Sequence, residues 1–242
     1  MRLKNYKTSL TSLVEKNKRS IFIKLFEYIK NPKNILPRIL WEFKKYKKEI
    51  DWHNRVKVMG NSSVFANKIS FKEQNKLTKT HEEMLYKVLK LKVKKKSKLL
   101  DFGCGYGRFQ KFFEKKLSLK YLGVEKEDLF LQKLNKKNFL SFRRFKKIKK
   151  YNKYFDIIFL WAVLGGFNDK NINQVVKILK KKLSQNGLIC FVEICSKKEI
   201  QGTWRFRTIN YYKNLFNGYN VNSNYYFLED GQKKVFFLVT RS

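Results

Sequence analysis

The sequence predicts an α/β fold: a doubly wound, mostly parallel sheet with a C-terminal antiparallel β-hairpin and a helical N-terminal extension. Three observations lead to it. Short apolar runs alternate with amphipathic helical stretches from about residue 80 onward, which is typical of a parallel sheet covered on both faces. A glycine-rich turn follows the first of these apolar runs. Near the end of the chain, Asp230-Gly231 separates two strand-like runs, and Asp-Gly is a strong hairpin signal.

The expected elements follow in a regular order. The helix before the first strand is expected to begin at Thr80, since Thr80 and Glu83 have the spacing of a capping box. Strands are expected at 98–102, 121–124, 139–142, 155–161 and 188–194, with helices between them at 109–117, 129–134 and 172–183. Asn186-Gly187 is expected to close the last of these helices as a C-cap. A short helix at 211–216 and strands at 219–228 and 234–240 end the predicted fold.

Residues 1–70 are expected to form a basic helical extension, or cap, on the domain at 71–242. Apolar residues recur at helical spacing between Ile21 and Ile29, and a second short helix is expected around 39–43, beyond Pro32 and Pro37. A basic amphipathic helix can lie on an anionic membrane, which would place the protein peripherally at the inner face of the membrane. More often such a helix packs on its own domain, and we favour packing.

The chain is strongly basic, with 56 Lys and Arg residues against 19 Asp and Glu and a formal net charge of +37. Such a charge can indicate a nucleic-acid partner, an anionic membrane surface or anionic substrates. Because the lysines are spread along the whole chain, we favour a general compositional bias as their origin. Nucleic acid is therefore a possible but less favoured partner.

The cysteines and the apolar stretches bear on the compartment. Three cysteines without C-x-x-C spacing disfavour a disulfide framework and a zinc site, and no metal site is predicted. The N-terminus lacks the apolar core of a secretion signal. The most apolar stretch, Phe155 to Phe167, contains Asp156 and is too short to span a bilayer. These features favour the cytoplasm.

The glycine-rich turn runs from Asp101 to Gly107, where the first strand gives way to the next helix. Glycines at 103, 105 and 107 let the backbone turn sharply and approach a ligand closely. A carboxylate at Asp101 can hold the ammonium or sulfonium end of a zwitterionic ligand, whereas an anionic pyrophosphate would be repelled. The second strand ends at Glu125, and an acid there can accept hydrogen bonds from both ribose hydroxyls. The acids and glycines together predict a nucleoside-type cofactor site.

The run from Asp101 to Phe109, DFGCGYGRF, resembles motif I of the class I S-adenosylmethionine-dependent methyltransferases, a Rossmann-like family. Phe155 to Ile158 is similar to that family's fourth strand, Asn186-Gly187-Leu188 to the turn into its fifth, and the terminal hairpin to its closing strands. The resemblance covers about residues 75–242. It implies S-adenosyl-L-methionine as methyl donor. The residues that would line its methionine moiety are Asp101, Gly103, Gly105 and Gly107. Glu125 would bind the ribose, and Leu160 and Trp161 would lie beside the sulfonium.

The sequence departs from the family's pattern in two places. Many members carry an Asp after the third strand to bind the adenine amino group, whereas this chain has Ser141-Phe142-Arg143 there, so stacking on Phe142 or backbone groups are expected instead. Many small-molecule members carry a His after the fourth strand, where this chain has Gly165-Gly166. The resemblance therefore assigns no general base.

Two residues are candidates for the base. Glu193, at the end of the fifth strand, points toward the crevice in which such sheets bind ligands, although an ion pair with Arg205 or Arg207 is an alternative. His81 is the second candidate, with a solvated position in the first turn of its helix as the alternative.

The segment after the fifth strand is the expected acceptor side. Trp204, Arg205 and Arg207 combine an aromatic ring with guanidinium groups, which suits a sugar or an anionic group. Alternatively, Trp204 belongs to the core and the arginines are solvated. Segments 54–56, 63–64, 164–166 and 204–208 are also similar to a bacterial subgroup of methyltransferases associated with surface-glycan gene sets.

These observations predict an enzyme that transfers a methyl group to an oxygen or nitrogen of a small-molecule or glycan-type acceptor. An RNA methyltransferase acting on ribose or guanine is the alternative. With prolines only at 32 and 37, the chain lacks the Asn/Asp-Pro-Pro-aromatic tetrapeptide for adenine amino groups and the Pro-Cys nucleophile for cytosine C5. A third possibility, a non-catalytic cofactor-binding module, is disfavoured by the intact set of acids and glycines.

Overall fold

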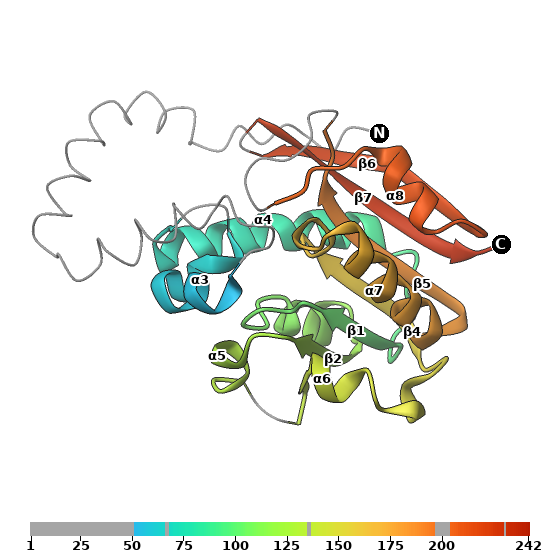
Figure 1. The fold of residues 1–242 in the computed structure, drawn as a ribbon, viewed down its shortest axis with the longest axis horizontal. Coiled ribbons are helices and arrows are strands. Elements are labelled where there is room, and N and C mark those ends of the chain that lie inside the picture. The colour runs from blue at the N-terminus through green and yellow to red at the C-terminus, as the bar shows by residue number, and fades with distance from the viewer. Residues whose placement is uncertain (1–50, 66–67, 135–136, 197–203, 230) are drawn as a thin grey trace, which may run out of the picture.

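The computed structural model describes residues 51–65, 68–134, 137–196, 204–229 and 231–242. Its centre is a seven-stranded sheet with the order β3-β2-β1-β4-β5-β7-β6 (Figure 1). Strands β1 (Lys98–Phe102), β2 (Lys120–Glu125), β3 (Phe139–Ser141), β4 (Phe155–Trp161) and β5 (Leu183–Ile194) are parallel. Strands β6 (Tyr219–Glu229) and β7 (Gln232–Arg241) form an antiparallel hairpin whose β7 pairs with β5. The predicted fold class is confirmed.

Helices cover both faces of the sheet, as the continuous apolar strands require. On one face lie α4 (Phe71–Leu89) and η3 (Phe112–Lys116); on the other lie α6 (Phe142–Phe145), α7 (Asp169–Lys182) and α8 (Ile209–Leu215). The alternation along β4 shows both cores: Phe159 packs on the α4 side, whereas Ile158 and Leu160 pack on the α7 side. The shorter elements are α3 (Trp52–Met59), η2 (Gly60–Val64), α5 (Asp128–Leu131), η4 (Lys149–Tyr151) and η5 (Leu164–Gly166).

The predicted start of the helix before β1 is wrong by about nine residues. Helix α4 begins at Phe71 and has its capping box at Ser70 and Glu73, where each side chain bonds the other residue's backbone N–H. Thr80 lies inside the helix, and its hydroxyl donates to the carbonyl of Lys76. Residues 71–79 are mostly polar and solvent-facing, so they lack the apolar stripe by which the helix was recognised.

The predicted C-cap at Asn186-Gly187 is also wrong. Helix α7 ends at Lys182, and Leu183 is already extended and pairs with Phe155. Asn186 and Gly187 therefore lie within β5, next to an irregular register between β4 and β5. The predicted helices around 21–29 and 39–43 lie outside the described residues. Within the described part of the chain, no helix combines the length and apolar character needed to cross a membrane.

Candidate active site

The glycine-rich turn after β1 adopts a backbone that favours glycine. Gly103 and Gly105 have φ angles of +73° and +56°, and the N–H of Gly103 donates to the carbonyl of Val124 at 2.7 Å. A Cβ atom on Gly103 would lie 2.7 Å from a methyl of Val163, and one on Gly105 would lie 2.7 Å from a methyl of Val64. The turn is thus approached closely from two sides, by the loop after β4 and by the segment before α4.

Asp101 lies beneath this turn and is almost fully buried, with 2% of its surface exposed. The hydroxyl of Tyr121 on β2 donates to its Oδ2 at 2.8 Å. Burial raises the pKa of Asp101 to about 7, although the Tyr121 hydrogen bond and the nearby Arg108 lower it. The carboxyl group therefore gains or loses its charge near neutral pH.

Glu125 at the end of β2 ties the turn to the neighbouring loop. Its Oε2 accepts a hydrogen bond from the N–H of Gly105 at 2.7 Å, and its Oε1 accepts from the N–H groups of Lys126 at 2.7 Å and Glu127 at 3.1 Å. Burial raises its pKa, and these three backbone bonds oppose that shift. Glu125 thus reaches the turn from the strand next to β1, as the sequence predicts for an acid that faces a ribose.

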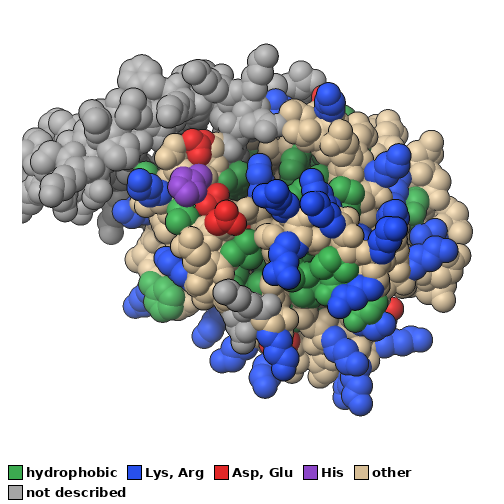
Figure 2. All heavy atoms as spheres, turned by 60° about the horizontal axis from the view of Figure 1, so that its bottom comes forward, with side chains coloured by type: hydrophobic (Ala, Val, Ile, Leu, Met, Phe, Trp, Pro, Cys, Tyr) green, Lys and Arg blue, Asp and Glu red, His purple; other side chains and the backbone are tan. Residues whose placement is uncertain are grey.

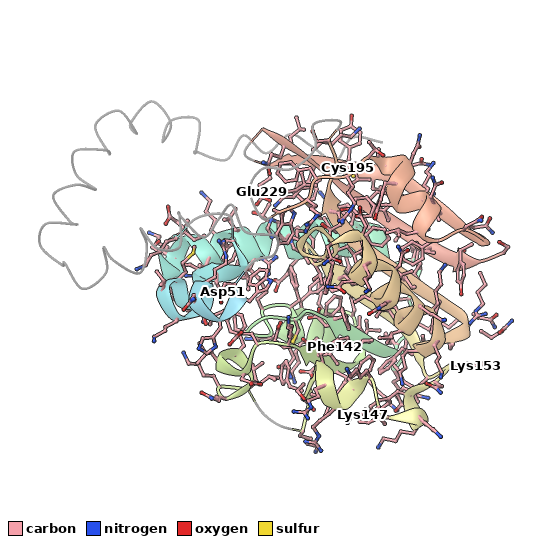
Figure 3. The ribbon with its side chains drawn as sticks, viewed as in Figure 1. Asp51, Phe142, Lys147, Lys153, Cys195 and Glu229 are labelled. Atoms are coloured by element: carbon pink, nitrogen blue, oxygen red, sulfur yellow. The ribbon has the colours of Figure 1, made fainter. Side chains whose placement is uncertain are left out.

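A buried polar chain joins α4, the glycine-rich turn and the β6–β7 hairpin. His81 is 3% exposed, and its Nε2 lies 3.0 Å from Oε1 of Glu229, which also pairs with Lys234. Its Nδ1 lies 3.2 Å from a guanidinium nitrogen of Arg108. Because a guanidinium can only donate, Nδ1 must be the acceptor, so His81 is neutral and carries its proton on Nε2. Burial lowers the pKa of His81 to about 4, which agrees with a neutral ring. Figure 3 shows Glu229 beside α4.

Arg108, the residue after the last glycine of the turn, is a partly buried cation that lies among aromatic rings. Its guanidinium carbon lies 4.2 Å from the ring centroid of Phe109, 5.0 Å from Phe65 and 5.4 Å from Trp161. The ion pairs within the described residues do not include it. Burial lowers its pKa to about 10, so it stays charged at neutral pH. An aromatic-walled cation beside Asp101 is suited to receive a carboxylate.

The remaining predicted donor residues lie around the ends of β1, β3 and β4. Trp161 stacks on His81 with ring centroids 4.4 Å apart, so it lies at the same edge as Arg108. Phe142 meets Phe102 edge to face at 5.4 Å, on the β3 side of the turn. Leu160 is fully buried in the core under α7. Trp161 and Phe142 therefore border the turn, while the contacts of Leu160 are those of a core residue.

Glu193 is fully engaged by the loop after β4. Its Oε1 accepts from the N–H groups of Val163 at 2.7 Å and Leu164 at 2.6 Å, and its Oε2 accepts from Gly165 at 3.3 Å. Burial raises its pKa to about 7 against these bonds. The ion pair with Arg205 or Arg207 that we considered is not among those of the described residues. The geometry is that of a carboxylate that holds a loop in place.

The predicted acceptor residues gather on that same loop. The Cβ of an alanine at Gly165 would lie 2.3 Å from Nε1 of Trp204, and the N–H of Arg205 donates to the carbonyl of Gly165 at 2.9 Å. Arg207 donates to the carbonyls of Leu164 and Phe167 and pairs with Asp169 at 2.8 Å. The indole Nε1 of Trp204 is buried and has no hydrogen-bond partner within the described residues.

The segment before α4 covers the glycine-rich turn. Arg55 on α3 donates to the carbonyls of Ser63 at 2.8 Å and Phe65 at 2.6 Å, which fixes the stretch that carries Val64. Trp52 meets Trp204 edge to face at 6.4 Å, so the same helix also reaches the loop after β4. The sequence predicted a cap at 1–70; of its described residues, the stretch 51–65 lies over the turn and beside the predicted acceptor residues.

The structure thus brings together most of the predicted site residues and adds some that sequence reasoning missed. Asp101, Glu125, Trp161 and Phe142 surround one turn; Glu193, Trp204, Arg205 and Arg207 surround the next loop. The additions are Arg108, Tyr121 and the pair Arg55 and Val64. Arg108 directly follows the last glycine of the turn, which was a usable signal; the pairing of Tyr121 with Asp101 depends on strand register. Within the described residues, no cluster of His, Cys, Asp or Glu is arranged to hold a metal ion.

The fold and the acid–glycine–acid site define the class of Rossmann-like methyltransferases. The family model described as a methyltransferase domain matches residues 73–222, and the chain belongs to this family.

Solved structures show the same fold. A SAM-dependent methyltransferase from Leishmania major aligns with a TM-score of 0.63 and 18% identity over 84% of this chain and 91% of that one. One from Archaeoglobus fulgidus gives 0.55 and 12% over 68% and 94%. The 1,6-didemethyltoxoflavin-N1-methyltransferase of Burkholderia thailandensis, solved with S-adenosylhomocysteine, gives 0.52 and 13% over 68% and 78%. No curated protein matches the chain.

Proposed function

We propose that this protein transfers a methyl group from S-adenosyl-L-methionine to a nitrogen or oxygen of a small-molecule or glycan-type acceptor. The observation that carries the donor assignment is the set of charges around the turn. A buried acid, Asp101, lies together with an aromatic-walled cation, Arg108, that forms no ion pair within the described residues, which matches the ammonium and carboxylate of an amino-acid zwitterion.

Each donor-site residue then has a defined task. Asp101 accepts from the ammonium group, and Arg108 pairs with the carboxylate. When the ligand binds, Glu125 gives up its hydrogen bond from the N–H of Gly105 and accepts hydrogen bonds from the ribose hydroxyls instead. The N–H of Gly105 can then donate to the ligand. Phe142, partly buried beside β3, offers its ring to the adenine. Val163 and Val64 have to shift when the ligand enters. Their methyl groups lie against Gly103 and Gly105, where the ligand approaches the turn.

The donor supplies an electrophilic methyl group on its sulfonium, and the transfer is an in-line displacement. The chain's contribution is to orient the acceptor and to exclude water. Trp161 lies at the end of β4 beside the turn, and the loop at 163–166 forms the adjoining wall. Trp52 and Trp204 close the site from the cap side, and the indole N–H of Trp204, which has no hydrogen-bond partner among the described residues, suits a polar acceptor group.

Both candidate bases are engaged in hydrogen bonds to other described residues. The oxygens of Glu193 accept hydrogen bonds from three backbone N–H groups. Both nitrogens of the neutral His81 are hydrogen-bonded, one to Glu229 and the other to Arg108. We therefore assign both a positioning role: Glu193 holds the acceptor loop and His81 orients Arg108. This favours a nitrogen acceptor that arrives deprotonated over a hydroxyl that needs a base. Arg205 and Arg207 flank the acceptor loop and suit an acceptor with an anionic or sugar group.

Thermal shift with S-adenosylhomocysteine tests the donor assignment. At about 100 times its dissociation constant the ligand adds about 2.7 kcal/mol, which raises Tm by roughly 5–11 °C for a chain of this size. The shift should disappear in Asp101→Ala and Asp101→Asn and persist in Asp128→Asn, an exposed acid nearby. A folded wild type that shows no shift, or an unchanged shift in both Asp101 variants, would contradict the proposal.

Donor affinity should also depend on pH through Asp101. With a pKa of about 7, the Asp101 carboxyl is protonated in half of the free protein at pH 7. That half must lose the proton before the carboxylate can bind the ammonium group. Affinity should therefore fall as pH drops below 7, by up to about tenfold per pH unit. Titration calorimetry between about pH 5.5 and 8.5 measures this. Because Asp101→Asn is expected to abolish binding, the profile has to be tested in a variant that keeps Asp101.

Tyr121→Phe provides the matched variant for that profile. The Tyr121 hydroxyl lowers the pKa of Asp101 by donating to its carboxylate, so its removal should shift the midpoint to higher pH. A midpoint that stays in place would show that Asp101 does not control the pH dependence.

A further inference from the structure

Lysines from three separate segments of the sequence meet at one end of the folded chain. Segments 90–98, 115–120 and 146–153 carry six, three and five lysines and no Asp or Glu. All three precede a parallel strand, namely β1, β2 and β4, so they lie at the amino-terminal edge of the sheet. We call these segments, together with Lys181, the lysine edge.

Direct contacts join the segments. The N–H of Lys96 donates to the carbonyl of Ser118 at 2.7 Å, and that of Lys120 donates to Ser97 at 2.9 Å. The ammonium of Lys98 lies 4.1 Å from the ring centroid of Tyr154, and the N–H of Lys153 donates to Lys181 at 3.0 Å. The lysine edge is therefore one surface.

Four acids lie at the other end of the sheet. Asp101, Glu125, Glu193 and Glu229 lie at or near the carboxyl ends of the parallel strands. Asp156, at the lysine end, is bound to the N–H of Lys98 and the hydroxyl of Ser184. Figure 2 shows Lys and Arg over much of the visible face, with acids gathered around a histidine toward its left side; in Figure 3, Lys147 and Lys153 lie at the end away from Asp51.

Favourable interaction with helix C-termini accounts for lysines in or just after a last turn, such as Lys90, Lys116 and Lys181, and its influence ends within one turn. The lysines at 94–96 lie beyond that range, in the connection between α4 and β1. The lysines at 94–96, 115–116 and 149–150 are exposed, and none of these residues is in an ion pair of the described chain. Such a surface repels itself unless a polyanion neutralises it.

An open groove of about 540 Å³ adjoins the lysine edge. Lys92 lies in both. The other lining residues include the side chains of Asn186, Asn220, Asn222 and Thr240, above Leu188 and Leu238 of the sheet. Asn220 and Asn222 are exposed, and Asn220 lies opposite Thr240 across the β6–β7 pair. An amide side chain both donates and accepts, which is what the edge of an unpaired base requires.

We propose that the lysine edge and this groove form a binding site for single-stranded nucleic acid. The lysines contact the phosphates, and the asparagine groove takes base edges. Asp101 lies three residues beyond Lys98 on β1, a separation of about 10 Å at roughly 3.3 Å per residue. The site is thus distinct from the donor site, and a nucleic acid bound there need not be the methyl acceptor. A polar groove favours bases over a membrane, because a flat lipid surface would not enter it.

Fluorescence anisotropy with single-stranded RNA and DNA oligonucleotides of about 12 nucleotides tests this, over a range of salt concentrations. The triple variant Lys92→Glu/Lys94→Glu/Lys95→Glu should bind at least about tenfold more weakly and reduce the slope of log K against log salt by about 2. Lys72→Glu/Lys76→Glu/Lys79→Glu makes the same change in net charge on the first half of α4 and should have a much smaller effect.

The groove is tested separately. Asn220→Ala/Asn222→Ala should weaken binding severalfold but leave the salt slope unchanged, because no charge is removed. The thermal shift with S-adenosylhomocysteine should stay normal in all three variants, which separates this proposal from that on the donor. Equal losses in the two lysine variants would assign binding to net charge alone and overturn the site. So would binding to phosphatidylglycerol vesicles without binding to either oligonucleotide.

Discussion

Replacing Glu193 by alanine is expected to lower the free energy of unfolding by about 3–5 kcal/mol. The substitution removes the only carboxylate that accepts from Val163, Leu164 and Gly165, whose N–H groups then lie buried or half-buried without their partner. The methyl group of Val163 that contacts the glycine-rich turn would lose its support, so donor affinity should fall as well. Urea unfolding followed by circular dichroism measures the first effect, and calorimetry with S-adenosylhomocysteine the second.

Glu193→Gln distinguishes this role from that of a catalytic base. The two shortest bonds share a single oxygen, Oε1, and an amide oxygen can keep both of them. Gln should therefore cost only about 1–2 kcal/mol and retain most of the turnover. Glu83→Ala, which removes an exposed acid on α4, should change stability by less than about 0.5 kcal/mol. Loss of all turnover in a stable Glu193→Gln protein would instead identify Glu193 as the base.

Replacing Glu125 by alanine is expected to weaken S-adenosylhomocysteine binding by at least about 100-fold. Two hydrogen bonds to a charged acceptor contribute about 1.5–3 kcal/mol each, and the substitution also frees the N–H of Gly105 that now bonds the carboxylate. Titration calorimetry gives the affinity directly. Full affinity in Glu125→Ala would remove Glu125 from the donor site.

Two controls accompany this measurement. Asp128→Ala removes an exposed acid three residues along and should leave affinity unchanged within about twofold. Glu125→Gln keeps one acceptor oxygen and should bind between the wild type and the alanine variant. If the unliganded Glu125→Ala protein unfolds at a much lower temperature, its lost affinity should be compared with the donor affinity of Glu193→Ala. That variant disturbs the other side of the same turn.

Elements with strong local signals were predicted closely. The apolar run at 155–161 coincides with β4, and Gly231 of the Asp-Gly pair lies between β6 and β7. The start of α4 was placed too late, because two Ser/Thr-x-x-Glu pairs, at Ser70 and Thr80, have equal spacing and only the second precedes an apolar stripe. Asn186-Gly187 reads as a helix end in isolation. It is held in a strand because Leu183 already pairs with Phe155.

The same division holds for the site. Asp101, the glycines and Glu125 were identifiable because they lie within one short motif and at the end of the next strand. The partners of Glu193 were not, because the N–H groups of Val163 to Gly165 lie about 30 residues away along the chain. His81 was expected in the first turn of its helix, with a solvated position as the alternative to a base role. It is buried because α4 begins nine residues earlier and the hairpin brings Glu229 against it.

The sequence by itself determined the class of fold, the order of strands and helices, and the position of the donor motif. These depend on local periodicity and on residues close together in the chain, which act before any tertiary contact forms. The tertiary structure decided which charges are paired and which meet. Glu193 became a loop anchor, Arg108 a cation beside Asp101, and lysines from three distant segments one surface. Such outcomes depend on which strands pair and in which register, and no local pattern encodes that.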